Sequence, residues 1–109
     1  MLLNLKEYED LIIGTWVSIN EDATITDSEQ WLQFEEDKVI IKMNNMPTAV
    51  LKYAIGFDGD FYLMFFAYPV LTYNILHVDN NLIVIKLRNS SIEQYFKRSN
   101  ITNIVIDSN

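Results

Sequence analysis

Short hydrophobic segments, separated by turn-forming residues, follow one another along almost the whole chain. Most of them alternate apolar and polar side chains, which is the period of a half-buried strand. The segments predicted to be strands are 12–19, 30–35, 38–43, 50–57, 61–68, 71–78, 82–87 and 92–98. A further segment, 101–106, is predicted to be either a ninth strand or a packed tail.

The connections between these segments are short and rich in residues that favour tight turns. They include Glu36-Asp37, Asp58-Gly59-Asp60, Asp79-Asn80-Asn81 and Asn89-Ser90-Ser91. Such connections join neighbouring antiparallel strands, and closing the resulting meander removes its exposed edges. The sequence therefore predicts an all-β fold, an up-and-down antiparallel β-barrel of about eight strands. A sandwich or a strongly curved open sheet is the alternative architecture.

The first residues follow a different pattern from the rest of the chain. Leu5, Tyr8 and Leu11 recur every three residues, which favours one or two helical turns before the first strand. The 109 residues contain no repeat or linker, so a single domain over residues 1–109 is predicted. The absence of cysteine excludes a disulfide scaffold and a cysteine nucleophile. No signal-peptide pattern precedes Leu5, so a cytoplasmic location without a membrane anchor is expected.

The segment Leu11-Ile12-Ile13-Gly14-Thr15-Trp16 places a Gly-x-Trp motif just after the helical segment. This arrangement resembles the start of lipocalin-like (calycin) barrels, and the chain is similar in length to small bacterial domains of that kind. In that family a basic residue near the end of the last strand packs across the tryptophan. The resemblance therefore implies that Gly14, Trp16 and Arg98 form a structural motif, with Lys97 as the alternative basic residue.

The same resemblance implies a non-enzymatic protein that holds a small apolar ligand in the mouth of its barrel. Aromatic and methionine side chains are crowded in the middle of the chain, and they either line such a cavity or fill the core. Which of them face inward depends on strand register, because a slip of one residue exchanges the two faces. The candidate lining residues are Trp31, Phe34, Tyr53, Phe57, Met64, Phe66 and Tyr73.

The net charge of −7 is concentrated near the start of the sequence, where residues 1–37 hold ten acidic residues and one lysine. An acidic chain is repelled by phosphates, which argues against direct binding to nucleic acid or to an anionic membrane. It is attracted to a basic protein surface instead. The alternative function is therefore an inhibitor of the immunity or anti-defence type that docks on a basic partner. The candidate contact residues are Glu21, Asp22, Asp27, Glu29, Glu35, Glu36 and Asp37.

The single histidine offers the one arrangement that suggests catalysis. His77 and Asp79 are two residues apart on a predicted strand, so they point the same way and resemble a base oriented by a carboxylate. A hydrolase would also need a nucleophile, and nothing in the sequence places Ser18, Ser90 or Ser91 beside them. The acidic turns do not match a calcium loop, and no phosphate-binding motif is present. We therefore predict no catalytic residue, no metal site and no cofactor.

Overall fold

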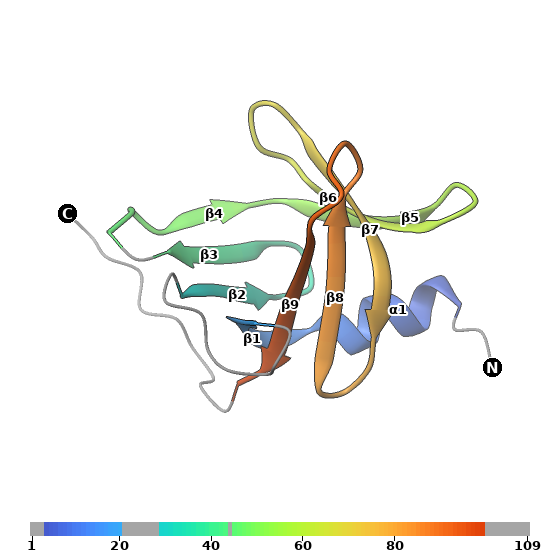
Figure 1. Cartoon of the computed structure of the whole chain (residues 1–109), viewed down its shortest axis with the longest axis horizontal. Helices are drawn as coiled ribbons and strands as arrows, with labels where there is room; N and C mark the ends of the chain where they lie inside the picture. The colour runs from blue at the N-terminus through green and yellow to red at the C-terminus, as the bar shows by residue number, and fades with distance from the viewer. Residues whose placement is uncertain (1–3, 21–28, 44, 100–109) are drawn as a thin grey trace.

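The computed structural model describes residues 4–20, 29–43 and 45–99, which form one helix and nine strands (Figure 1). The helix, α1, is Leu5–Ile12. The strands are β1 (Gly14–Ile19), β2 (Gln30–Phe34), β3 (Val39–Met43), β4 (Ala49–Leu51), β5 (Tyr53–Phe57), β6 (Phe61–Phe65), β7 (Leu71–Val78), β8 (Leu82–Leu87) and β9 (Glu93–Arg98). All pairings between them are antiparallel.

The strands form a nearly closed barrel. Their order in the sheet is β4-β3-β2-β1-β9-β8-β7-β6-β5. The two ends of this order, β4 and β5, are separated in the chain by Lys52 alone, so they are two halves of one bent segment. Its first half pairs with β3 and its second half with β6. The predicted all-β up-and-down barrel is confirmed, and the predicted strand 50–57 is interrupted where it passes from one neighbour to the other.

Several predicted boundaries differ from the observed ones. Ile12 belongs to α1 and not to the first strand, and β6 ends at Phe65 and not at Tyr68. The pairing of β6 with β5 and with β7 reaches only Phe65, so residues 66–68 of the predicted strand have no strand beside them. The turn at Asp58–Asp60 is present, and Gly59 adopts a φ of 112° there. The predicted segment 101–106 lies outside the described residues.

The short helix is explained by its own sequence. Asn4 caps it by accepting a hydrogen bond from the Glu7 amide at 2.9 Å, and the Glu7 carboxylate accepts one from the Asn4 amide at 3.3 Å. Such a reciprocal cap satisfies amides that the first turn leaves without a partner. Tyr8 and Leu11 pack against the barrel core, and Tyr8 stacks on Phe61 with ring centroids 4.1 Å apart. In the described part of the chain, no helix has the length and apolar character required to cross a membrane.

The inside of the barrel is occupied by side chains. Buried residues from α1 and from most of the strands form one hydrophobic cluster: Ile12, Trp16, Leu32, Phe34, Val39, Leu63, Phe65, Ile75, Val78, Ile83, Ile85 and Phe96. These residues alternate along their strands with residues of the outer face, as expected for a barrel wall. The sequence left open whether the interior is a ligand cavity or a filled core. Along the barrel axis it is a filled core.

The two ends of the barrel differ in what covers them. Successive connections of an up-and-down barrel lie at alternate ends, so the turns at 35–38, 58–60 and 79–81 share one end. This is the end where α1 lies against β5 and β7, and we call it the helix end. Segments 45–48, 66–70 and 89–92 lie at the other end, which we call the loop end.

Candidate functional site

Arg98 closes the helix end of the barrel over the face of Trp16. Trp16 is completely buried, and its indole nitrogen donates a hydrogen bond to the carbonyl of Ile12 at 2.9 Å. The guanidinium carbon of Arg98 lies 4.2 Å from the centre of the Trp16 ring. The same guanidinium donates to the carbonyls of Leu11, Ile13 and Asn80 at 2.7, 2.8 and 2.6 Å. Arg98 thereby connects the end of α1, the residue that joins it to β1, and the β7–β8 turn.

Gly14 makes this close approach feasible. Its φ is +130°, a conformation that residues with a side chain rarely adopt. A Cβ atom at this position would lie 2.4 Å from Nη1 of Arg98. The sequence motif thus has a structural explanation, because Arg98 lies against both Gly14 and Trp16 and closes this end of the barrel. None of the three is among the residues that line the pocket described next.

A pocket of about 470 Å³ lies at the helix end, between α1, the β2–β3 turn and β5. Its wall combines polar residues of the helix and turn with apolar residues of the strand. The lining residues are Lys6, Glu9, Asp10, Ile13, Glu36, Tyr53, Ala54 and Ile55. The pocket is therefore an open cleft beside the packed core, with an apolar floor and a charged rim.

The rim of the pocket is predominantly negative. Glu9, Asp10 and Glu36 contribute three carboxylates, whereas Lys6 contributes one ammonium, which pairs with Asp10 at 3.0 Å. Burial raises the pKa of Tyr53 to about 12, and the negative charges of Glu9, Asp37 and Glu36 act in the same direction. The Tyr53 hydroxyl donates a hydrogen bond to the Glu35 carbonyl, which holds the β2–β3 turn against β5.

The seven candidate lining residues do not gather around one cavity. Phe34 is buried in the core, and Tyr53 and Tyr73 pack against it; Tyr53 alone also lines the pocket. Trp31 and Met64 alternate with core residues on their strands, so they lie on the outer face. Phe57 at the end of β5 and Phe66 beyond β6 are largely exposed. Three of the seven candidates thus lie in or against the core, while Trp31 and Met64 lie on the face that a register shift of one residue would exchange for the inner one. A ligand contact of any of the seven stays a prediction.

The predicted acidic contact surface is also divided. Glu35, Glu36 and Asp37 lie in the β2–β3 turn at the helix end, and Glu36 lines the pocket. Glu29 precedes β2 at its opposite end, where it accepts a hydrogen bond from the Trp31 indole at 3.2 Å. Glu21, Asp22 and Asp27 lie outside the described residues.

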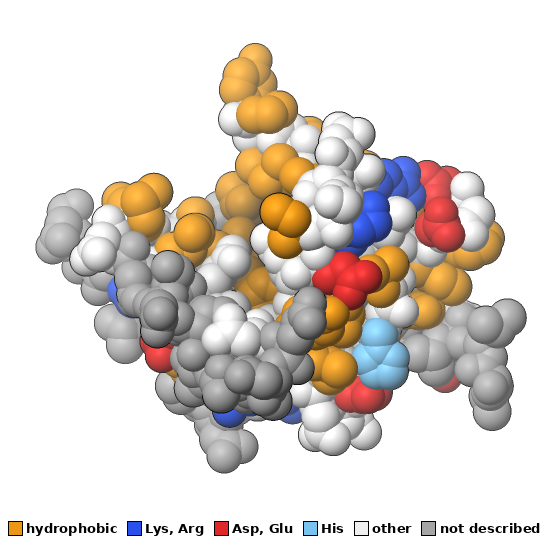
Figure 2. Space-filling model, viewed as in Figure 1, with side chains coloured by type: hydrophobic (Ala, Val, Ile, Leu, Met, Phe, Trp, Pro, Cys, Tyr) orange, Lys and Arg blue, Asp and Glu red, His pale blue; other side chains and the backbone are white. Residues whose placement is uncertain are grey.

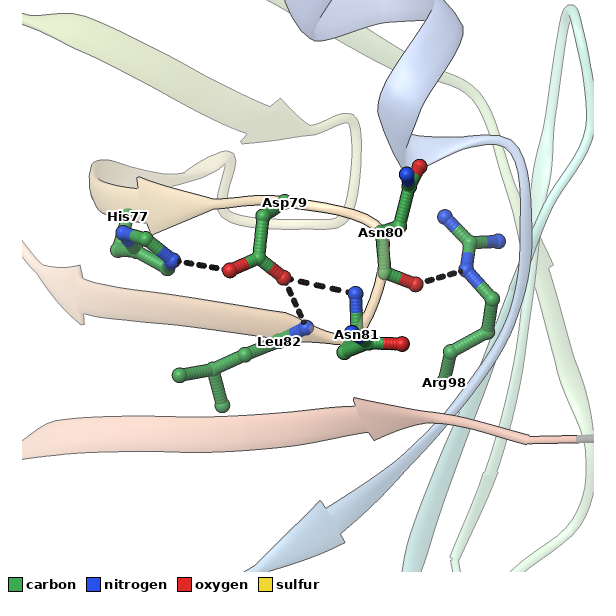
Figure 3. Close-up of polar contacts among 6 residues, drawn as sticks. All are labelled: His77, Asp79, Asn80, Asn81, Leu82 and Arg98. Carbon is green, nitrogen blue, oxygen red and sulfur yellow. Dashed lines mark hydrogen bonds and ion pairs between the residues drawn. The ribbon is translucent and has the colours of Figure 1, made fainter.

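His77 and Asp79 do contact each other, as their spacing suggested. His77 Nε2 lies 2.7 Å from one carboxylate oxygen of Asp79, and the other oxygen accepts hydrogen bonds from the amides of Asn81 and Leu82 (Figure 3). Asn80, in the same turn, accepts from Arg98. Asp79 thus shapes the turn that meets Arg98.

Two of the serines considered as nucleophiles make hydrogen bonds with residues other than His77 and Asp79. Ser90 and Ser91 follow β8 at the loop end, a strand length away from the β7–β8 turn, and Ser90 accepts a hydrogen bond from the Ile92 amide. Ser18 accepts one from the Gln30 amide. The described residues also contain no group of three or more His, Asp or Glu side chains arranged to hold a metal ion.

Sequence reasoning missed the contribution of α1 to the pocket. Lys6, Glu9 and Asp10 form the polar side of a helix whose apolar side, with Tyr8 and Leu11, packs on the core. The three-residue spacing indicated both sides, but not which strand and turn the polar side would meet.

Comparisons with protein-family models, with curated proteins and with solved structures found no match.

Proposed function

We propose that this chain is a non-enzymatic binding protein that holds a small amphipathic amine in the pocket at its helix end. The observation that carries this proposal is the pocket of about 470 Å³, which combines an apolar floor with a rim of three carboxylates. Pockets for small molecules commonly have volumes of about 300–1,000 Å³ and combine apolar walls with a few charged groups. The lipocalin-like resemblance supports a binding role, although it implied a purely apolar ligand.

The apolar part of such a ligand would lie against Ile13, Ala54 and Ile55, whose side chains border the pocket. These residues are partly exposed, so a bound hydrocarbon chain would remove apolar surface from water. Burial of that surface contributes about 25 cal/mol for each Å². The fit favours a short aliphatic or aromatic body over a long lipid chain, because the barrel axis behind the pocket is filled.

The cationic group would lie at the rim, between α1 and the β2–β3 turn. Among the described residues, Glu9 and Glu36 have no ion-pair partner, whereas the carboxylate of Asp10 is paired with Lys6. An ammonium group beside Glu9 and Glu36 would form charge-assisted hydrogen bonds with both carboxylates. A carboxylate ligand would be repelled from the same position, so the pocket is expected to discriminate by charge.

Isothermal titration calorimetry with hexylamine and hexanoate tests the proposal. We expect hexylamine to bind and hexanoate, which has the same chain length, to bind at least 10-fold more weakly. Glu36→Gln or Glu9→Gln should each weaken hexylamine binding by about 5- to 10-fold, as expected for the loss of one charged hydrogen bond. Asp60→Asn, in a turn at the same end but outside the pocket, is the matched control and should leave the affinity unchanged. Equal binding of the two ligands, or no binding of hexylamine, would contradict the proposal.

A second candidate function is an inhibitor that docks its helix end on a basic protein surface. It is favoured by the gathering of Glu9, Asp10, Glu36 and Asp37 around the pocket and by the net charge of −7. Docking of this kind depends strongly on salt, because exposed charges carry it. Binding to immobilised poly-lysine should then fall steeply with ionic strength and fall again in Glu36→Gln. Binding that is independent of salt would exclude this candidate.

A further inference from the structure

One edge of β5 is left without a neighbouring strand. β5 pairs with β6 along one side, and within the described residues no strand pairs with its other side. An unpaired strand edge offers backbone donors and acceptors to an extended segment of another chain. We call this side of β5 its free edge.

The pairing with β6 shows which backbone groups face the free edge. The Phe66 amide donates to the Lys52 carbonyl at 3.0 Å, directly before the first residue of β5. Bonded and non-bonded pairs alternate along an antiparallel ladder, so every second residue after Lys52 bonds to β6. Tyr53, Ile55 and Phe57 between them therefore direct their backbone amides and carbonyls to the free edge.

The pocket at the helix end lies along this free edge. Tyr53 and Ile55 pack against the core, Ala54 between them belongs to the other face of the strand, and all three line the pocket. A pocket that reaches both faces of a strand lies beside its edge, and none of the lining residues belongs to β6. The Ile55 amide and carbonyl therefore border the same pocket as the carboxylates of Glu9 and Glu36.

These groups together match the chemistry of an amino-terminal peptide segment. Its ammonium group would bond to Glu9 and Glu36, which have no ion-pair partner among the described residues, since the Lys6 ammonium pairs with Asp10. Its first side chain would cover the apolar floor, and its following peptide groups would bond to Ile55. A simple alkylamine fills the first two roles but leaves the backbone groups of Ile55 unused.

We propose that the ligand of this pocket is the free amino terminus of a peptide that begins with an apolar residue and adds to the free edge of β5 as a short strand. This inference rests on the proposed function, because it uses the same carboxylates and the same apolar floor. It adds the hydrogen bonds that give strand addition its affinity. Successive amides of an extended peptide point to opposite sides, so only every second one can face Ile55.

Calorimetry with a tetrapeptide amide, leucine followed by three alanines, tests the inference beside hexylamine. We expect the peptide to bind at least 5-fold more tightly than hexylamine, and its N-acetylated form at least 10-fold more weakly than the free form. Methylation of the second or of the third backbone nitrogen should differ in effect. One of the two should weaken binding at least 5-fold, whereas the other, which points away from β5, is the matched control.

Hydrogen exchange of the full chain locates the contact. Saturation with the peptide should slow exchange of the Ile55 amide at least 10-fold, because a peptide carbonyl would then accept its hydrogen. The amides of Ala54 and Gly56 face β6, so their exchange should not change and they serve as internal controls. Saturation with hexylamine should leave all three amides unchanged.

Several outcomes would overturn the inference. If hexylamine binds and the peptide binds no more tightly, the strand addition is wrong and the proposed function stands; if neither binds, both are wrong. Equal losses for the two N-methylated peptides would also exclude strand addition. A further outcome is capture of the leucine side chain by the β6–β7 loop, which stands out from the barrel with hydrophobic side chains at its edge (Figures 1 and 2). Peptide binding that Tyr68→Lys abolishes would assign the contact there, whereas we expect that variant to bind as the wild type does.

Discussion

Gly14 shows how one residue can constrain a whole end of a barrel. We expect Gly14→Ala to reduce the free energy of unfolding by about 3 kcal/mol, because the alanine is strained at a φ of +130° and displaces Arg98. Urea denaturation followed by tryptophan fluorescence measures this change. Gly59→Ala is the control for strain alone, since Gly59 has a φ of +112° and a Cβ atom there would meet no other atom within 4 Å. Equal losses in the two variants would show that contact with Arg98 contributes nothing.

The chemistry of Arg98 makes it difficult to replace, even by lysine. A lysine ammonium cannot reach the carbonyls of Leu11, Ile13 and Asn80 together or stack flat on Trp16. We expect Arg98→Lys to lower the free energy of unfolding by about 2–4 kcal/mol in the same urea experiment. The reverse exchange at the neighbouring position, Lys97→Arg, should change it by less than about 0.5 kcal/mol. A comparable loss in both variants would contradict the role of Arg98.

At the scale of elements, the β7–β8 turn depends on Asp79. Its carboxylate accepts hydrogen bonds from two turn amides and contacts His77, and these contacts hold the pKa of Asp79 below its usual range, with His77 as the largest cause. The stabilisation is therefore present above the ordinary aspartate pKa and is lost as the pH falls through the lowered pKa of the folded state.

We expect Asp79→Ala to destabilise the protein by about 1–2 kcal/mol at neutral pH, because it removes the oxygen that accepts hydrogen bonds from both turn amides. Asp79→Asn retains an acceptor oxygen but no titratable group, so its stability should decline less than that of the wild type on acidification. Thermal melting between neutral and acidic pH measures both effects. An identical acid dependence in wild type and Asp79→Asn would contradict this explanation.

Tyr53 connects β5 to the β2–β3 turn and responds to alkaline pH. Its folded pKa of about 12 lies above the value of about 10 expected in the unfolded chain. Stability from this group is therefore full below pH 10 and is lost as the pH rises towards 12. Burial also raises the pKa of Tyr73, so Tyr53→Phe should reduce the alkaline loss without abolishing it. Circular dichroism at increasing pH measures the difference, and an unchanged alkaline midpoint would contradict it.

The sequence predicted elements better than it predicted the site. Strand alternation and turn residues are local, so the segment 71–78 and the turn at Asp58–Asp60 were found where they occur. The contact of Arg98 with Trp16 was expected from a resemblance and is present. The pocket was missed, because it forms only when α1 meets β5 and the β2–β3 turn. Such contacts depend on the tertiary packing of an amphipathic helix, which periodicity alone does not specify.

At the scale of the whole molecule, the two ends of the barrel differ in charge. Carboxylates surround the pocket at the helix end, whereas segments 45–48, 66–70 and 89–92 at the loop end carry no charged residue and expose several apolar side chains. The packed core between them separates the two surfaces. Hexylamine affinity should therefore be unchanged in Tyr68→Lys, because Tyr68 lies at the end opposite the pocket.

The most direct test of the central claim is an amide-resolved NMR titration of the full chain with hexylamine. If the ligand occupies the pocket, the largest shift changes should fall on residues 6–13, 36 and 53–55 and saturate together. Hexanoate at the same concentrations should leave these amides unchanged. Saturable shifts confined to the loop end, or equal shifts with both ligands, would contradict an amine site at the helix end.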